Sequence, residues 1–296
     1  MQVASVNVNG IRAAARKGFG QWLAAAAPDV LLMQEVRAPE EITRELVPES
    51  YQLFAHPSEI AGRAGVAVAV RKDIAVGQVR AGLHAGLAAG KPEEPVDTGR
   101  WLEVDLPELT GAGELRGGVT VVSAYLHSGV AGDPAKMAAK YSHLERVTAR
   151  LEQLNAVREH EVDPAQPGLA NVLVAGDFNI VRTALDIKNW KGNHNKTSGV
   201  LDAEISYLDR WFGDLDRGGQ GWVDAQRALI GPEAEAPYTW WSNRGQAFDR
   251  NVGWRIDYQM VTPGLAAVAR EARVDRAASY AERWSDHAPL VVGYAL

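Results

Sequence analysis

Residues 172–180 read Val-Leu-Val-Ala-Gly-Asp-Phe-Asn-Ile, an apolar run of strand length that ends in an acidic and an amide side chain. The run is continuously apolar, as expected of a strand that is covered on both faces. Polar groups at strand ends are where the sites of α/β proteins are usually assembled. This stretch therefore predicts an α/β fold with Asp177 and Asn179 at a functional edge.

The same pattern recurs along the whole chain. Further strands are expected at Val3–Val8, Val30–Met33, Gly65–Val70, Trp101–Leu106, Val119–Leu126, Ile256–Val261 and Leu290–Ala295, in addition to Val172–Ala175. The polar residues in or beside these runs are Asn7, Asn9, Glu35, Tyr125, Asp257, Asp286 and His287. Each of these residues alone is compatible with a turn, a cap or a solvated side chain. The prediction of a functional site therefore rests on the repeated occurrence of polar residues in or beside apolar strands.

Helices are expected between the strands. Arg12–Ala27 is rich in alanine and is stopped by Pro28, and Asp133–His160 carries apolar residues at spacings of three and four that are typical of a core-facing helix. Two glycine-rich stretches, Arg80–Gly99 and Leu109–Gly118, are expected to be surface loops. No linker divides the chain, so residues 1–296 are expected to form a single catalytic domain with strands of mixed order.

The amino-acid composition excludes several classes of protein and of active site. The 296 residues are 46% hydrophobic and 23% charged, which fits a globular protein, and the absence of cysteine excludes disulfides, thiolate metal sites and a cysteine nucleophile. No apolar run is long enough to span a membrane and the N-terminus has no leader pattern, so the cytoplasm is the expected location. The formal charge of −6 argues against a nonspecific nucleic-acid coat protein but does not exclude a nuclease.

The collected side chains suit a divalent cation and a phosphate. Asp257 is flanked by Ile256 and Tyr258, and such a carboxylate is costly unless it is paired or metal-bound. Several carboxylates with amides, one tyrosine and one histidine match the oxygen ligands of a hard cation. A zinc hydrolase would need more histidines, a serine hydrolase would need the GxSxG motif, and a glycosidase would leave the asparagines and His287 without roles.

Six ordered motifs resemble the exonuclease III family of abasic-site endonucleases, within the endonuclease/exonuclease/phosphatase superfamily. They are Ser5-Val6-Asn7-Val8-Asn9-Gly10-Ile11-Arg12, Gln34-Glu35-Val36-Arg37, Ala124-Tyr125, Gly176-Asp177-Phe178-Asn179-Ile180, Trp254-Arg255-Ile256-Asp257-Tyr258 and Ser285-Asp286-His287-Ala288-Pro289-Leu290. Asp186–Asn193 and Gly253–Asp257 are narrower signals for the abasic-site branch. The chain departs from the family at Ser128, where an amide is frequent, and at Arg37, where lysine is frequent.

The resemblance implies a fold, a reaction and a set of roles. The implied fold is a four-layer α/β/β/α sandwich of two packed mixed sheets, and the implied reaction is Mg²⁺-dependent hydrolysis of DNA, with Mn²⁺ as a substitute, 5′ to abasic sites or at 3′ ends. The catalytic residues would be Tyr125, Asp177, Asn179, Asp257 and His287. Either Asp177 or Tyr125 as phenolate would be the base, and one or two metal ions would act.

The remaining roles concern metal and DNA. The metal environment would include Asn7, Glu35, Asp177, Asn179, Asp286 and His287, with Glu35 as the principal ligand. The substrate-binding residues would be Asn9, Arg37, Asn189, Asn193, Trp240, Trp254 and Ile256. The partner would be double-stranded DNA, with no membrane, and the protein would be a monomer. Two alternatives stay open: a superfamily phosphatase or phosphodiesterase acting on a lipid or soluble phosphate, and a non-catalytic DNA-binding relative.

Overall fold

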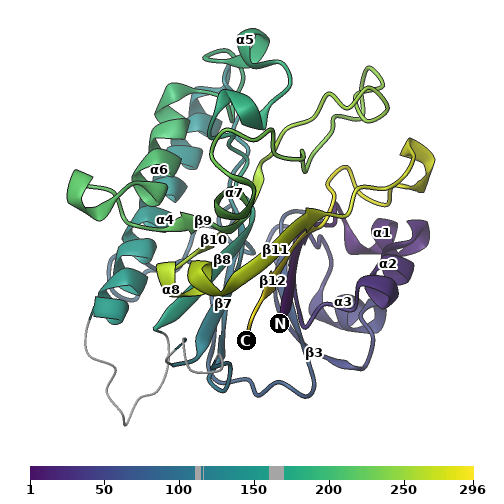
Figure 1. The fold of residues 1–296 in the computed structure, drawn as a ribbon, viewed down its shortest axis with the longest axis vertical. Helices are drawn as coiled ribbons and strands as arrows, with labels where there is room; N and C mark the ends of the chain where they lie inside the picture. The colour runs from purple at the N-terminus through teal and green to yellow at the C-terminus, as the bar shows by residue number, and fades with distance from the viewer. Residues whose placement is uncertain (111–114, 116, 160–169) are drawn as a thin grey trace.

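The computed structural model describes residues 1–110, 115, 117–159 and 170–296, and its centre consists of two six-stranded β-sheets (Figure 1). The first sheet has the strand order β11-β12-β1-β2-β4-β3. Its strands are β1 (Gln2–Asn7), β2 (Val30–Gln34), β3 (Tyr51–His56), β4 (Val66–Arg71), β11 (Ala269–Val274) and β12 (Leu290–Tyr294). Only β1 and β2 run parallel among the paired strands, so this sheet is mixed.

The second sheet has the strand order β5-β6-β7-β8-β10-β9. Its strands are β5 (Val79–Ala81), β6 (Trp101–Leu106), β7 (Val119–Tyr125), β8 (Asn171–Asp177), β9 (Val223–Asp224) and β10 (Asp257–Val261). Strands β7 and β8 form its parallel pair, and the other paired strands are antiparallel. The two sheets therefore share one plan, a parallel pair with antiparallel neighbours.

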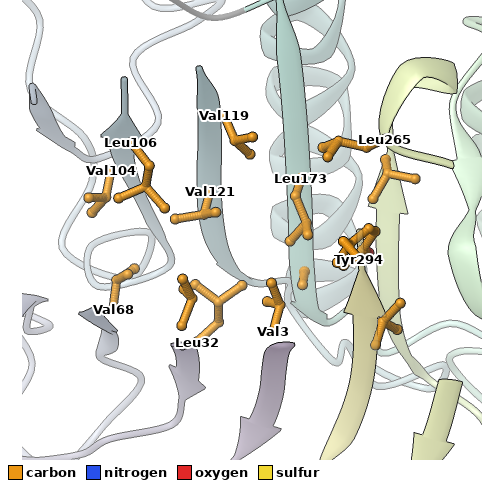
Figure 2. Close-up of a cluster of buried hydrophobic side chains, with 14 of the residues drawn as sticks. Val3, Leu32, Val68, Val104, Leu106, Val119, Val121, Leu173, Leu265 and Tyr294 are labelled. Atoms are coloured by element: carbon orange, nitrogen blue, oxygen red, sulfur yellow. The ribbon is translucent and has the colours of Figure 1, made fainter. Parts of the chain in front are cut away.

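The sheets face each other across an apolar core. Val3, Leu32 and Val68 of the first sheet point toward Val121 and Leu173 of the second, and all five are fully buried (Figure 2). Burial of this kind contributes about 1.5–3 kcal/mol for each large apolar side chain. The alternate side chains of the same strands face outward and are covered by helices.

Helices complete the outer layers. The helices are α1 (Ile11–Lys17), α2 (Phe19–Ala26), α3 (Glu40–Leu46), α4 (Pro134–Glu159), α5 (Trp190–Asn193), α6 (Asp202–Phe212), α7 (Ala225–Ile230) and α8 (Pro263–Val268), with short 3₁₀ turns at Ala184–Asp186, Leu215–Arg217 and Tyr280–Glu282. Helices α4 and α6 pack on the second sheet, and α1 to α3 lie beside the first (Figure 1). The expected four-layer α/β/β/α sandwich is confirmed.

Several sequence-based boundaries need correction. The single helix expected at Arg12–Ala27 is wrong, because Gly18 with φ 122° breaks it into α1 and α2. The loop expected from Arg80 begins instead inside β5, which ends at Ala81. Strands β3, β5, β9 and β11 have no counterpart among the strands expected from the sequence. The end of the helix expected at Asp133–His160, and part of the loop Leu109–Gly118, lie outside the described residues.

Among the residues described, no helix combines the length and the apolar character that crossing a membrane requires.

Candidate active site

Strand direction brings the polar residues of both sheets to one edge. Asn7 ends β1, Tyr125 ends β7 and Asp177 ends β8, while Glu35 follows directly after β2. The antiparallel strand β10 starts at this edge, with Asp257 opposite Asp177. His287 lies just before β12, whose first residue pairs with Ser5 of β1. The two parallel pairs therefore explain why residues far apart in sequence meet here.

Asn7 holds two carboxylates together. Its Nδ2 donates to Glu35 Oε1 at 3.0 Å and to Asp177 Oδ2 at 2.9 Å. Its Oδ1 accepts the Asn9 backbone N–H at 2.9 Å, so the amide oxygen faces away from the carboxylates. The Tyr125 hydroxyl donates to Glu35 Oε1 at 2.6 Å. Asn7 therefore orients the carboxylates in this structure.

His287 lies between two aspartates. Its Nδ1 donates to Asp257 Oδ2 at 2.8 Å, and its Nε2 lies 3.7 Å from Asp177 Oδ2. The ligand atoms of these three residues all lie within 4.8 Å of one another. Asn179 supports Asp177 through a backbone N–H bond of 2.9 Å and an Nδ2 bond of 3.2 Å. All three side chains are buried, so their charges interact with little screening by water.

Burial and neighbouring charge set the pKa values here. Burial alone would lower the pKa of His287, but the charges of Asp257 and Asp177 raise it to about 10. Burial raises the pKa of Asp177 to about 7, with the charges of Asp257 and Glu35 adding to the effect against the favourable charge of His287. Burial and the charges of Glu35 and Asp177 raise the pKa of Tyr125 well above its ordinary value. The site therefore concentrates negative charge that a divalent cation would neutralise.

Four residues of the site have left-handed backbone conformations. Asn9, Glu35, Arg37 and Asn179 have φ values of 47°, 49°, 51° and 53°. Glutamate and arginine rarely adopt this region, and such strain tends to cluster at functional sites. It turns the Glu35 side chain back toward the end of β1, where Asn7 and Tyr125 bind it and the Arg37 guanidinium contacts it.

An open cavity of about 710 Å³ exposes this constellation. The predicted residues that line it are Asn9, Glu35, Arg37, Tyr125, Asp177, Asn179, Trp240, Trp254, Ile256, Asp286 and His287. Asn7 and Asp257 lie buried behind them. A larger hollow of about 1020 Å³ over α3 and β3 contains none of the predicted residues, so we place the chemistry in the smaller one.

The aromatic wall of the cavity is tied to Asp286. Trp240 Nε1 donates to Asp286 Oδ2 at 3.2 Å, and Asn9 Nδ2 donates to its Oδ1 at 2.8 Å. The Trp240 and Trp254 rings meet edge to face with centroids 5.4 Å apart, and both pack with Ile256. Both tryptophans are only partly buried, so their remaining surface faces the cavity.

Two predicted substrate residues lie elsewhere. Asn189 precedes α5 and Asn193 ends it, Asn193 Nδ2 donates to the Asn189 carbonyl at 2.8 Å, and neither residue lines the cavity. The following segment Lys196–Ser198 lines it instead, together with Ser128–Gly132 after β7. Sequence reasoning missed both segments, because neither belongs to one of the six motifs, although Ser128 was noted as a departure from the family.

A second histidine cluster has a different character. Asp97, His127 and His143 also bring ligand atoms within 4.8 Å of one another. However, Arg146 lies 2.7 Å from Asp97 and 3.4 Å from His143 Nδ1, so a guanidinium already supplies the positive charge. Burial lowers the pKa of His143 well below its ordinary value, and the neighbouring cations lower it further. We interpret this cluster as a structural ion network and not as a metal site.

Comparison with known proteins decides the family. The sequence profile described as the Endonuclease/Exonuclease/phosphatase family matches residues 4–287. The chain belongs to this family. It is 29% identical to the exodeoxyribonuclease of Bacillus subtilis (strain 168) over 98% of both chains. It is 28% identical to exodeoxyribonuclease III of Haemophilus influenzae, again over 98% of both chains. The resemblance inferred from the six motifs is thereby confirmed.

Solved structures agree on the fold. The catalytic domain of Xenopus laevis APE2 superposes with a TM-score of 0.78 at 20% identity, and the match covers 100% of this chain and 92% of that one. The 3′-5′ exonuclease NExo of Neisseria meningitidis gives 0.75 at 23% identity, with both chains fully covered. At these identities the likeness concerns the fold, which agrees with the two sheets described above.

Proposed function

We propose that this protein is a metal-dependent DNA repair nuclease that cleaves phosphodiester bonds 5′ to abasic sites or at 3′ ends. One observation carries the proposal: Glu35, Asp177 and His287 meet in a cavity walled by Trp240 and Trp254. The carboxylates and the histidine suit hydrolysis of a phosphate ester, and the aromatic wall suits an extruded sugar. The exodeoxyribonuclease relatives support DNA as the substrate.

Asp177 is our choice for the base. Its pKa of about 7 is suited to accepting a proton from water at neutral pH. Tyr125, the other candidate, would have to ionise against a pKa raised well above its ordinary value by burial and by Glu35. Asn179 holds Asp177 in place through two hydrogen bonds, so that its oxygen keeps a fixed direction toward an attacking water.

His287 is our choice for the phosphate donor. Its pKa of about 10 keeps it protonated at neutral pH, and Asp257 occupies its Nδ1, so Nε2 is left to donate to a nonbridging phosphate oxygen. A protonated imidazole does not ligate a metal, which favours this role over the alternative of metal ligand. Tyr125 would donate a second hydrogen bond to the phosphate only by turning its single hydroxyl proton away from Glu35 Oε1.

The donor set fits a hard cation. Glu35 and Asp286 line the same cavity with carboxylate oxygens, and Asn7 fixes the direction of Glu35. A bound Mg²⁺ would neutralise phosphate charge and favour departure of the leaving oxygen. We further propose that the protein acts as a monomer, because one chain by itself supplies the carboxylates, the histidine and the aromatic wall that the proposed reaction needs.

Two parallel assays test the proposed function. The protein is incubated with a labelled abasic duplex and a nicked duplex, with Mg²⁺ or with EDTA, for analysis on a gel, and separately with a phospholipid whose released phosphate is measured. We expect metal-dependent incision or 3′ trimming of DNA. Cleavage of the phospholipid alone would favour the superfamily phosphatase alternative, and DNA binding without cleavage would favour a non-catalytic relative.

The Glu35→Gln variant tests the metal assignment. Loss of one ligand charge should weaken Mg²⁺ affinity and activity together, and excess Mg²⁺ should restore part of the activity. Isothermal titration with Mg²⁺ and initial rates across Mg²⁺ concentrations measure both effects. Glu45→Gln, an exposed glutamate on α3, serves as the control. Wild-type kinetics at ordinary Mg²⁺ would contradict the assignment.

The Trp254→Ala variant tests the pocket wall. Opening the wall should admit undamaged nucleotides, so the ratio of abasic incision to 3′ exonuclease activity should fall while the melting temperature stays near that of the wild type. Trp241→Ala removes a fully buried ring from a neighbouring cluster and should lower the melting temperature and all activities alike. If Trp254→Ala behaves like Trp241→Ala, the ring has only a packing role.

A further inference from the structure

We propose that the buried ion pair of Lys140 and Glu204 is a positioning pair that holds three separate segments of the cavity wall in register. The proposal rests on the proposed function for its meaning in catalysis. Lys140 is on α4 and Glu204 is on α6, the two helices that cover the second sheet on its outer face (Figure 1). Neither residue lines the cavity, and the sequence singled out neither of them.

Lys140 reaches two segments directly. Its Nζ donates to the carbonyl of Ser128 at 3.1 Å and to the carbonyl of Asn179 at 3.1 Å. Ser128 is the first of the cavity-lining residues Ser128–Gly132 after β7, and Asn179 is the residue whose side chain supports Asp177. A single ammonium group therefore fixes both loops that emerge from the parallel pair β7 and β8.

Glu204 holds the third segment. One carboxylate oxygen binds Lys140 Nζ at 2.7 Å and accepts from Ser198 Oγ at 2.8 Å. The other oxygen accepts the backbone N–H groups of Gly199 at 2.5 Å and Leu201 at 3.1 Å. The segment Lys196–Ser198, which lines the cavity beside Ser128–Gly132 with Ser198 Oγ 2.6 Å from the Ser128 carbonyl oxygen, is thereby tied to the same ion pair.

The three segments fit closely around the pair. A Cβ added at Gly129 would lie 2.7 Å from Ser198 Oγ and 3.0 Å from Lys140 Cδ, and Gly129 has a φ of +66° that favours glycine. A Cβ added at Gly199 would lie 2.7 Å from the Asn179 carbonyl oxygen. A shift of any one segment would therefore be transmitted to the others.

A buried ion pair between two helices contributes little net free energy to stability. Both side chains are fully buried, and desolvation of two charges often cancels the energy that the pair gains. Lys140 of this pair binds the backbone of the cavity-lining residues Ser128 and Asn179. We therefore infer that the pair serves to position the cavity wall more than to raise the net stability of the fold. Small displacements of groups that position a substrate can cost about 10²-fold in rate.

The test uses Lys140→Met and the neutral double variant Lys140→Met/Glu204→Gln. Lys140→Met leaves Glu204 buried and unpaired, so both the melting temperature and kcat on the abasic duplex should fall. The double variant carries no unpaired charge, and glutamine can still accept from Gly199 and Leu201. Its melting temperature should return toward the wild-type value, while kcat should stay about 10²-fold low because the Ser128 and Asn179 carbonyls have lost their donor.

Arg150→Met is the matched control. Arg150 lies on the same helix and pairs with buried Glu103 at 2.7 Å, remote from the cavity lining. It should lower the melting temperature and leave kcat unchanged. In the Asn179→Ala background, Lys140→Met should cost much less than in the wild type, because part of its effect passes through Asn179.

Two outcomes would overturn the proposal: recovery of both stability and kcat in the double variant, or a kcat for Lys140→Met equal to that of Arg150→Met. If Lys140→Met does not fold, the double variant carries the test. Hydrogen exchange in peptides covering residues 126–133 and 196–200 should be faster in the double variant than in Arg150→Met. That measurement needs no substrate, so it judges the positioning pair even if the wild type does not cleave DNA.

Discussion

The Asp177→Asn variant should lose about 10²–10⁴-fold in kcat, the contribution typical of a general base. Asparagine keeps the shape of the side chain, but it cannot accept a proton from water, and its NH2 group replaces one of the two oxygens that accept from Asn7 and Asn179. DNA binding should survive, because a negative charge near the phosphate is removed. Single-turnover rates on an abasic duplex at saturating Mg²⁺, with gel-shift titration in EDTA, measure the two effects separately.

The same substitution should raise stability without metal. A carboxyl group whose pKa rises from 3.8 to about 7 on folding binds its proton more tightly in the native state. The free energy of unfolding therefore falls as the pH rises through that interval, and at pH 8 the group destabilises the fold. Asp177→Asn should melt at a higher temperature than the wild type in EDTA at pH 8, and the difference should shrink toward pH 4.

A control variant at the surface distinguishes the effect of losing any carboxylate charge from the effect of losing the carboxylate at position 177. Asp209→Asn removes an exposed carboxylate that pairs with Arg182, and it should change neither kcat nor the melting temperature appreciably. If Asp177→Asn turns over near the wild-type rate, Asp177 has a structural role and Tyr125 becomes the leading base. A lower melting temperature in EDTA would show that Asp177 contributes more through its hydrogen bonds than it costs through its charge.

The sequence predicted what depends on local pattern. Apolar runs located the strands that end in Asn7, Tyr125 and Asp177 and the strand that directly precedes Glu35, because the composition of a buried strand can be recognised without its neighbours. Asp257 stood out for the same reason, since a carboxylate between Ile256 and Tyr258 needs a partner, and the structure gives it His287. The prediction that these residues form one site rested on the family resemblance, because strand order and strand direction cannot be recognised from a local sequence pattern.

The sequence could not predict what depends on distant contacts. Lys140 lies on the same helix as an apolar stripe and looks like a solvated lysine, but α6 brings Glu204 against it and buries both. Asn189 and Asn193 matched a motif, yet the cavity is lined by Lys196–Ser198 a few residues later. Gly18 is an exception, because a glycine that caps the C-terminus of α1 is a helix-stop signal that the sequence itself contains. The differences at Lys140 and at the asparagines reflect tertiary contacts, which no local pattern in the sequence indicates.

The second large effect concerns His287 and Asp257. His287→Asn should lower kcat by about 10²–10³-fold, the usual cost of losing a donor to a charged transition state. Asp257→Asn should also lower kcat, because it removes the charge that keeps His287 protonated. Asp257 Oδ2 bonds to His287 Nδ1, and Asp257 Oδ1 has no hydrogen-bond partner among the described residues. The role of Asp257 in catalysis should therefore pass through His287.

That dependence predicts the result of a double-variant cycle. Asp257→Asn/His287→Asn should turn over little more slowly than His287→Asn alone, because the second substitution removes a support for a group already lost. The free energy of unfolding should also be non-additive, but here the second substitution should restore part of what the first one loses. His287→Asn leaves Asp257 buried without its charged partner, which costs about 3–5 kcal/mol, and the added Asp257→Asn should recover part of that loss. Single-turnover rates and urea denaturation of the four proteins measure both cycles. Losses in rate that multiply in the double variant would mean that the two residues act separately, whatever the distance of 2.8 Å between them suggests.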